Sequence, residues 1–169
     1  MPKLTATEIR NLLHLESHPV EGGYFAQTYE SSLRLAKNTL PAAYSAGRPA
    51  GTAIYYLLTP ETFSALHRLP GDEIFHFYLG DPVEMLELRP DGSSAAVLLG
   101  NDISAGMRPQ HVVHGGVWQG SRLLSGGEYA LLGTTMAPGF DYADYETGSR
   151  DQLIAQYPAL AGHILALTR

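Results

Sequence analysis

The chain has 169 residues, of which 44% are hydrophobic and 17% are charged, a composition typical of a folded domain rather than of a disordered chain. It has no cysteine, which excludes disulfide scaffolds, thiolate metal sites and cysteine nucleophiles. Its formal net charge of −6 argues against nucleic acid and anionic membranes as partners. We expect one cytoplasmic domain over residues 1–169, since no apolar stretch is long enough for a signal peptide or a membrane span.

The N-terminal residues predict a short helix. Thr5 and Glu8 have the spacing of a capping box, in which each side chain bonds to the backbone of the other residue. Ile9, Leu12 and Leu13 follow at helical spacing. We therefore expect this face of the helix to lie against the rest of the domain.

Short strands separated by turns are predicted from residue 24 onward, interrupted by one long loop. The loop, residues 31–50, is rich in Ser, Ala, Pro and Gly, and loops of this length often have a function. About nine strands at roughly ten-residue intervals favour an antiparallel sandwich or barrel, followed by short helices at Ser149–Gln156 and Ala159–Leu167. The expected strands are Tyr24–Glu30, Thr52–Leu58, Phe63–Leu69, Glu73–Leu79, Val83–Leu88, Ala95–Leu99, His111–Val113, Val117–Leu124 and Tyr129–Met136.

His67 and Glu73 are the strongest candidates for catalysis. An imidazole and a carboxylate can form an acid–base pair or bind a first-row metal. His67 ends one predicted strand and Glu73 begins the next, so both can point into one cavity if these strands are neighbours. Alternation places Glu73 on one face with Phe75 and Phe77, and His76 on the opposite face. The alternative is that these histidines are ordinary hydrogen-bonded core residues.

Other polar and aromatic residues are candidates for contacts with a small ligand. Trp118, the only tryptophan, can stack on a flat ligand or fill the core. The spacing of Gly139–Glu146 does not match a calcium-binding loop, and we interpret this segment as a solvated turn with an aromatic face, with a ligand site as the alternative. Phosphate-loop and serine-nucleophile motifs are absent from the sequence. The candidate ligand-binding residues are Tyr24, Thr52, Tyr56, His76, Tyr78, His114, Trp118 and Gln119.

An ordered set of short segments gives a more specific indication. Glu73, six further residues and Gly80 match the end of the first cupin motif, and His67 falls at the first histidine of that motif. The segments are Glu21-Gly22-Gly23-Tyr24, Ala53–Leu58, Asp72–Gly80, Gln110–Trp118 and Ala137–Phe140. Together they resemble the cupin-5 family, a domain of unknown function in the RmlC-like cupin superfamily. The resemblance implies an all-β fold, a double-stranded β-helix or jelly-roll barrel with short helices at both ends, and a homodimer.

Three positions depart from the pattern of this family. Leu69 stands where the first cupin motif has its second histidine, Gln119 where the second motif has its histidine, and His114 where cupin-5 members usually carry proline. Only His67 and Glu73 remain of the usual three histidines and one glutamate, and glutamine is a poor ligand for most first-row metals. We therefore assign no metal. If a divalent metal binds, its expected ligands are His67, Glu73 and Gln119.

Three functions remain open. The resemblance to sugar-nucleotide epimerase-like cupins implies a barrel that binds a small polar metabolite, such as a nucleotide or nucleotide sugar. His67 and Glu73 would then form the metal-free pair of an epimerase or isomerase. The alternatives are a metal-dependent oxygenase or isomerase, and a binding protein without catalysis. For the expected homodimer, the strand face bearing Ile74, His76 and Tyr78 is the predicted contact surface.

Overall fold

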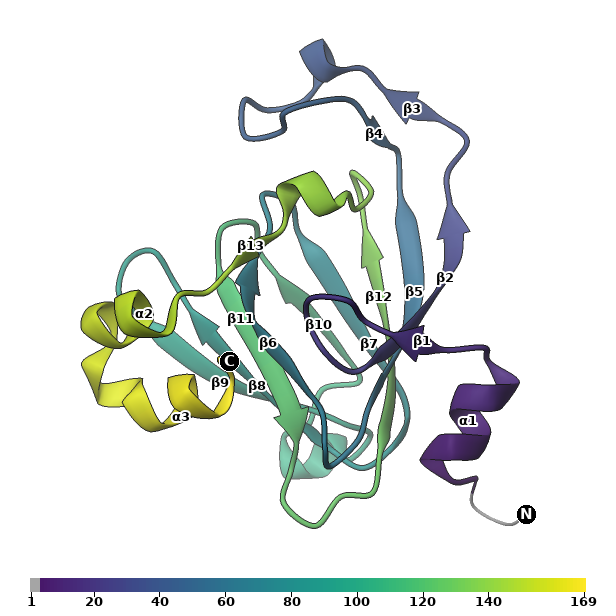
Figure 1. The fold of residues 1–169 in the computed structure, drawn as a ribbon, viewed down its shortest axis with the longest axis vertical. Coiled ribbons are helices and arrows are strands. Elements are labelled where there is room, and N and C mark those ends of the chain that lie inside the picture. The colour runs from purple at the N-terminus through teal and green to yellow at the C-terminus, as the bar shows by residue number, and fades with distance from the viewer. Residues whose placement is uncertain (1–3) are drawn as a thin grey trace.

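Two antiparallel β-sheets face each other in the computed structural model, which describes residues 4–169 (Figure 1). One sheet has the strand order β1-β2-β5-β12-β7-β10, and the other has the order β13-β6-β11-β8-β9. The strands are β1 (Glu16–Ser17), β2 (Tyr24–Glu30), β3 (Arg34–Leu35), β4 (Arg48–Pro49), β5 (Thr52–Leu58), β6 (Phe63–Arg68), β7 (Glu73–Gly80), β8 (Val83–Leu88), β9 (Ser94–Leu99), β10 (Gln110–Val113), β11 (Trp118–Leu123), β12 (Ala130–Met136) and β13 (Glu146–Thr147).

Short helices accompany the sheets. The α-helices are α1 (Ala6–Leu12), α2 (Arg150–Gln156) and α3 (Ala161–Ala166), and the 3-10 helices are η1 (Lys37–Thr39), η2 (Ile103–Ala105), η3 (Tyr142–Asp144) and η4 (Pro158–Leu160). The capping box of α1 is confirmed, because Thr5 accepts from the Glu8 amide while the Glu8 carboxylate accepts from the Thr5 amide. The all-β jelly-roll barrel with short terminal helices is likewise confirmed.

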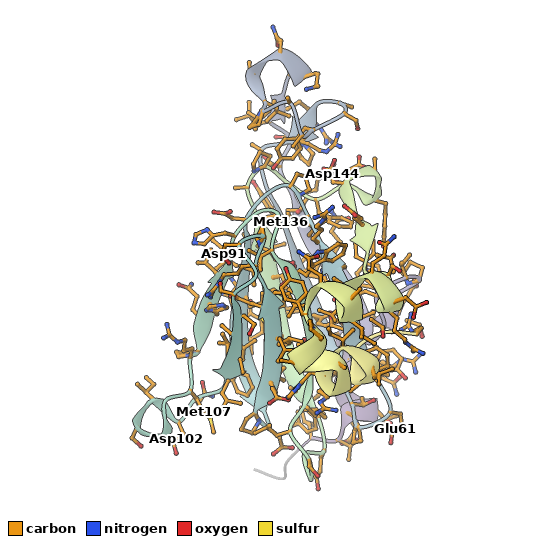
Figure 2. All side chains as sticks on the ribbon, turned by 90° about the vertical axis from the view of Figure 1, so that its left-hand side faces the viewer. Glu61, Asp91, Asp102, Met107, Met136 and Asp144 are labelled. Atoms are coloured by element: carbon orange, nitrogen blue, oxygen red, sulfur yellow. The ribbon has the colours of Figure 1, made fainter. Side chains whose placement is uncertain are left out.

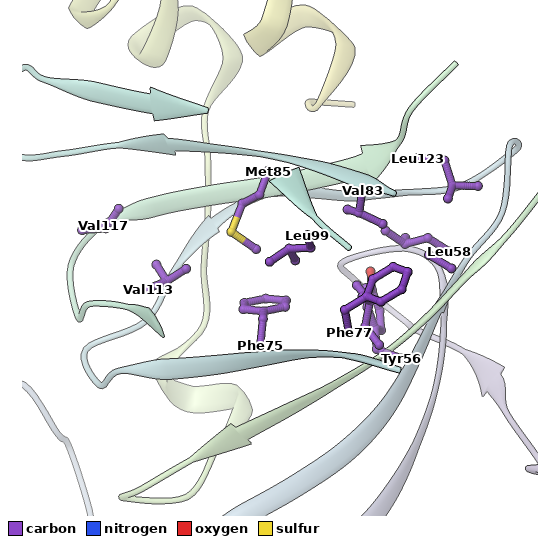
Figure 3. Packing of buried hydrophobic residues seen from close by; sticks show 12 residues of the cluster. Tyr56, Leu58, Phe75, Phe77, Val83, Met85, Leu99, Val113, Val117 and Leu123 are labelled. Atoms are coloured by element: carbon purple, nitrogen blue, oxygen red, sulfur yellow. The ribbon is translucent and has the colours of Figure 1, made fainter. Parts of the chain in front are cut away.

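The main apolar core lies between the two sheets. Inward side chains of β5, β7 and β12 meet those of β8, β9 and β11, and Figure 3 shows Phe75 and Phe77 facing Met85 and Leu99. Phe75, Met85 and Leu99 are almost completely buried. Burial of side chains of this size stabilises the fold by about 1.5–3 kcal/mol each. This cluster therefore holds the two sheets together and extends along β7 up to the position next to Glu73.

A second apolar cluster lies outside the barrel, where the C-terminal helices cover the sheet that contains β6, β8 and β11. Leu153 of α2 and Ile164 of α3 pack there with Leu66 and Trp118. The guanidinium carbon of Arg68 lies 4.5 Å from the centre of the Trp118 ring. Trp118 therefore fills the outer core, because it alternates along β11 with the inward Gln119.

Residues 31–50, predicted as a loop, form an arm that extends beyond one end of the barrel (Figure 1). Strands β3 and β4 pair within the arm as a two-stranded sheet. Arg48 of β4 forms a bidentate ion pair with Asp144 of η3, and the two side chains are only 1% and 5% exposed. Figure 2 shows Asp144 and Met136 at the end next to the arm, with Asp102 and Met107 at the opposite end. The pair therefore joins the arm to the segment after β12.

The outer face of β7 and β10 carries apolar side chains that the chain itself leaves exposed. Tyr78 is 46% exposed and Val112 is 37% exposed. Val112 lies opposite Ile74 in the register between the two strands, and the His76 and Tyr78 rings stack on the same face. Within residues 4–169, no helix is both long and apolar enough to cross a bilayer.

We propose that this outer face pairs two copies of the chain. Light scattering after size-exclusion chromatography should then give about twice the chain mass of 18.3 kDa. Tyr78→Arg should shift the mass towards one chain, because a charge would enter a desolvated contact. A wild-type mass of one chain would contradict the proposal.

Removal of the Arg48 charge should strongly destabilise the protein. Arg48→Ala leaves the buried Asp144 carboxylate without its partner, and such a loss typically lowers the free energy of unfolding by about 3–5 kcal/mol. Urea denaturation measures the change. The matched control is Arg34→Ala, which removes an exposed ion pair with Glu30 in the same arm and should cost less than about 1 kcal/mol. Equal effects of the two substitutions would contradict the structural role given to Arg48.

Candidate functional site

A cavity of about 280 Å³ lies at the end of the barrel near the arm. Strand register brings its walls together, because Met136 of β12 lies opposite both Thr52 of β5 and Glu73 of β7. The apolar core ends here, and polar side chains take over the inward positions. The lining residues are His18, Glu21, Phe25, Gln27, Glu30, Thr52, Ala53, Ile54, His67, Leu69, Glu73, Thr134, Met136, Phe140, Asp141 and Tyr142.

His67 is buried and held in a fixed orientation. Its Nδ1 lies 2.8 Å from the carbonyl oxygen of Ala65, and since a carbonyl only accepts, Nδ1 carries the hydrogen. The imidazole also stacks on the Tyr145 ring, with centroids 4.8 Å apart. In the neutral tautomer, Nε2 therefore has its lone pair free, 4.0 Å from Oε2 of Glu73.

Glu73 reaches the same point from the opposite sheet. Gln119 lies opposite His67 in the register of β11 with β6, and its Nε2 donates to Oε2 of Glu73 at 2.6 Å. Burial raises the pKa of Glu73, and the nearby carboxylate of Glu21 adds to the rise, while His67 opposes it. Three side chains from two sheets thus meet at the inner end of the cavity.

Residues before β2 provide a second histidine and glutamate that the sequence analysis missed. The Nδ1 of His18 accepts from the amides of Val20 and Glu21, which turns the chain so that both His18 and Glu21 line the cavity. Gly22 follows with φ +106°, and a Cβ there would lie 2.3 Å from the carbonyl oxygen of Phe63. Glycine is therefore required at this close approach. Burial lowers the pKa of His18, although Glu21 opposes the change.

The interpretation of Gly139–Glu146 as a solvated turn is right for the exposed residues Asp141–Ala143 and Glu146 but wrong for Asp144. Phe140, Asp141 and Tyr142 line the cavity, and Asp144 is buried against Arg48. The Thr52 hydroxyl accepts from the Phe140 amide at 2.9 Å, and the Asp141 carboxylate caps η3. The alternation of acidic and aromatic residues suggested exposure, but the long-range ion pair at Asp144 draws the segment over the cavity mouth.

The structure brings four of the predicted site residues together and separates the others. His67, Glu73 and Thr52 line the cavity, and Gln119 contacts Glu73. The remaining predicted residues lie elsewhere: Tyr24 against Arg10, Tyr56 in the core with its hydroxyl on the Gly22 carbonyl, His76 and Tyr78 on the outer face, His114 in an exposed turn beside Asp72, and Trp118 under the C-terminal helices. His76, Tyr78 and Trp118 point away from the barrel interior because each is adjacent along its strand to an inward-facing residue.

The donor atoms present do not match a metallocupin centre. No group of three His, Asp or Glu side chains in the described part of the chain is arranged to hold a metal ion. Leu69 occupies a lining position without a donor atom, and Gln119 directs its NH₂ group at Glu73. At the ligand positions of the cupin motifs one imidazole and one carboxylate remain, His67 and Glu73, fewer than the three protein ligands usual at a catalytic metal.

Comparison with known proteins gives a consistent family match. The family described as Cupin superfamily (DUF985) matches residues 7–148. The uncharacterized protein YML079W of Saccharomyces cerevisiae is 31% identical over 134 residues, covering 74% of this chain. The chain spans 66% of the length of that yeast relative.

Solved structures agree with this match. Protein SO0799 from Shewanella oneidensis is 32% identical, with a TM-score of 0.86 over 99% of each chain. A hypothetical protein from Leishmania major is 31% identical, with a TM-score of 0.87 over 98% of this chain and 99% of its own. Bacillus subtilis oxalate decarboxylase, described with Mn(II) centres, is 14% identical with a TM-score of 0.52, covering 90% of this chain and 37% of its own, and shares the fold alone.

The buried Glu73 carboxyl predicts a specific pH dependence of stability. Its pKa is raised in the folded state, so the folded protein binds the proton more tightly than the unfolded chain. The contribution of Glu73 to the free energy of unfolding is fully present below pH 4.5, and it is lost as the pH rises through the raised pKa. Glu73→Gln should therefore equal wild type near pH 4 and be more stable at pH 8, as measured by urea denaturation. The exposed Glu61→Gln serves as control, and a difference independent of pH would contradict the assignment.

Proposed function

This chain belongs to the DUF985 family of the cupin superfamily, and we propose that it binds a small polar metabolite in the cavity beside the arm, where His67 and Glu73 form a metal-free acid–base pair. The observation that carries the proposal is the fixed tautomer of His67. The hydrogen bond from Nδ1 to Ala65 leaves a basic nitrogen facing a buried carboxyl at 4.0 Å. Proton transfer is the chemistry that this pair supports best.

The two groups have complementary roles. His67 Nε2 can accept a proton from a carbon next to a carbonyl, and the electron pair left behind moves onto the carbonyl oxygen. Burial favours the protonated form of Glu73, which can donate to that oxygen. Return of the proton to the opposite face of the same carbon, while Glu73 takes back the proton from the oxygen, completes an epimerisation. Return to the neighbouring carbon, while Glu73 takes the proton of the adjacent hydroxyl, completes an isomerisation.

The cavity volume limits the size of the metabolite. About 280 Å³ lies at the small end of ligand pockets, enough for a monosaccharide-sized molecule. Polar side chains lie at the inner end and aromatic rings of Phe140 and Tyr142 at the mouth. This arrangement supports a polar ligand held between a reactive inner end and an apolar rim.

Proton exchange provides a test that does not require the product to be known. We expect wild-type protein in D₂O to replace the hydrogen on the carbon next to the carbonyl in at least one compound of a panel of aldoses, hydroxy ketones and 2-amino aldoses, followed by ¹H NMR. His67→Ala should slow this exchange at least about a hundredfold, the usual contribution of a general base. Circular dichroism confirms that the variant is folded.

The matched control is His76→Ala, which removes a histidine from the outer face of β7, in the opposite sheet. Its exchange rate should equal that of wild type. Undiminished exchange in His67→Ala would contradict the acid–base role. Saturable binding without exchange for every compound in the panel would instead favour a binding protein without catalysis.

A further inference from the structure

We propose that the cavity selects small organic ammonium ions, such as amino sugars, over neutral and anionic molecules of the same shape. This inference rests on the proposed function, because it names the ligand class for the same cavity. It follows from the charges, the unpaired acceptor and the aromatic rings around the cavity.

The charged groups lining the cavity are predominantly acidic. Glu21, Glu30, Glu73 and Asp141 contribute carboxylates, and no lysine or arginine is among the lining residues of the described chain. Arg34 already pairs with Glu30 at the mouth. Since burial favours the protonated form of Glu73, Glu21 and Asp141 are the two lining carboxylates without a lysine or arginine partner in residues 4–169.

The nearest arginines are engaged outside the cavity. Arg48 is buried in its ion pair with Asp144. Arg169 donates to the carbonyl oxygens of Val20 and Glu21 and lies over the Phe63 ring. The two lining histidines lie at the limit of ion-pair range, His18 at 3.9 Å from Glu21 and His67 at 4.0 Å from Glu73. A cationic ligand would supply the charge that the protein leaves unmatched.

An unpaired acceptor also indicates a ligand with hydrogen-bond donors. Gln119 is only 2% exposed, and its Oε1 has no hydrogen-bond partner within the described residues. The Nε2 of the same amide group donates to the carboxyl of Glu73, which lines the cavity, so Oε1 lies close to Glu73. A buried acceptor without a partner is destabilising. An ammonium group only donates hydrogen bonds, so it suits an acceptor of this kind and the lining carboxylates of Glu21 and Asp141.

Aromatic rings complete a suitable environment for a cation. Phe140 and Tyr142 form an edge-to-face pair with centroids 5.0 Å apart, and Phe25 packs edge-to-face on His18 at 4.8 Å. Ring faces attract ammonium groups without hydrogen-bonding to them. The phosphates of the nucleotide or nucleotide sugar expected from the sequence would instead meet carboxylates, with repulsion that no lining lysine or arginine offsets.

The test uses probes that differ in charge but share a scaffold. Glucosamine, glucose and glucuronate form one series, and choline with its neutral isostere 3,3-dimethylbutan-1-ol forms another. Isothermal titration of the full chain at pH 7 should give saturable binding of an ammonium member that is at least about tenfold tighter than its neutral counterpart. Glucuronate should not bind. Absence of ammonium binding, or equal binding of the neutral counterpart, would overturn the proposal.

Charge-neutral substitutions locate the binding. Glu21→Gln retains a side chain that can accept from Ser64 and should weaken ammonium binding at least about tenfold, as should Asp141→Asn. Glu61→Gln, outside this cavity, should leave the affinity unchanged. Binding that is unaffected by Glu21→Gln and Asp141→Asn would place the ammonium ion elsewhere and overturn the assignment.

The two proposals fail in different ways. Glucosamine binding without exchange of its C2 hydrogen in D₂O supports the ammonium preference and contradicts the acid–base role of His67. Exchange of the C2 hydrogen of glucose at the rate found for glucosamine, with equal affinities, supports the acid–base role and overturns the ammonium preference.

Discussion

The structure depends on one constraint, that each of two facing sheets must bury one side. Along β7 the inward side carries Phe77, Phe75 and then Glu73, so a single strand passes from apolar core to polar cavity within five residues. On the opposite sheet, His67 of β6 and Gln119 of β11 lie opposite each other and place polar side chains at the same level. The candidate site is therefore the continuation of the core, with the sheets held apart at the fixed spacing that the aromatic residues impose.

The sheet framework was predictable because its signals are local. Strands β2, β5 and β8 have the bounds that alternation and turns predicted, and the other long strands differ by about one residue at one or both ends. The two-residue strands β1, β3, β4 and β13 were missed, since a period of two cannot be detected in two residues. The arm therefore looked like a loop, although its pairing with itself orders it.

The site was predictable only on the strands. Alternation correctly gave the inward direction of Glu73, and the cupin resemblance selected His67 and Gln119. Glu21 and Tyr142 lie outside the long strands, so no alternation of residues indicates where their side chains point. The position of Glu21 depends on the close approach of Gly22 to the Phe63 carbonyl, and that of Tyr142 on the buried pair of Asp144 with Arg48. Trp118 was included among the ligand-binding candidates because no local signal indicates that the C-terminal helices cover the outer face of β11.

The Arg48–Asp144 pair also has a consequence for the order of folding. Its residues are 96 positions apart, and closing so long a loop before the intervening strands have paired carries a large entropy loss. The mouth of the cavity should therefore form after the barrel walls, when β5 and β12 already hold the arm and η3 close together. Contacts absent from the folding transition state act mainly on the unfolding rate. This ion pair would then govern how long the assembled cavity persists rather than how fast the barrel forms.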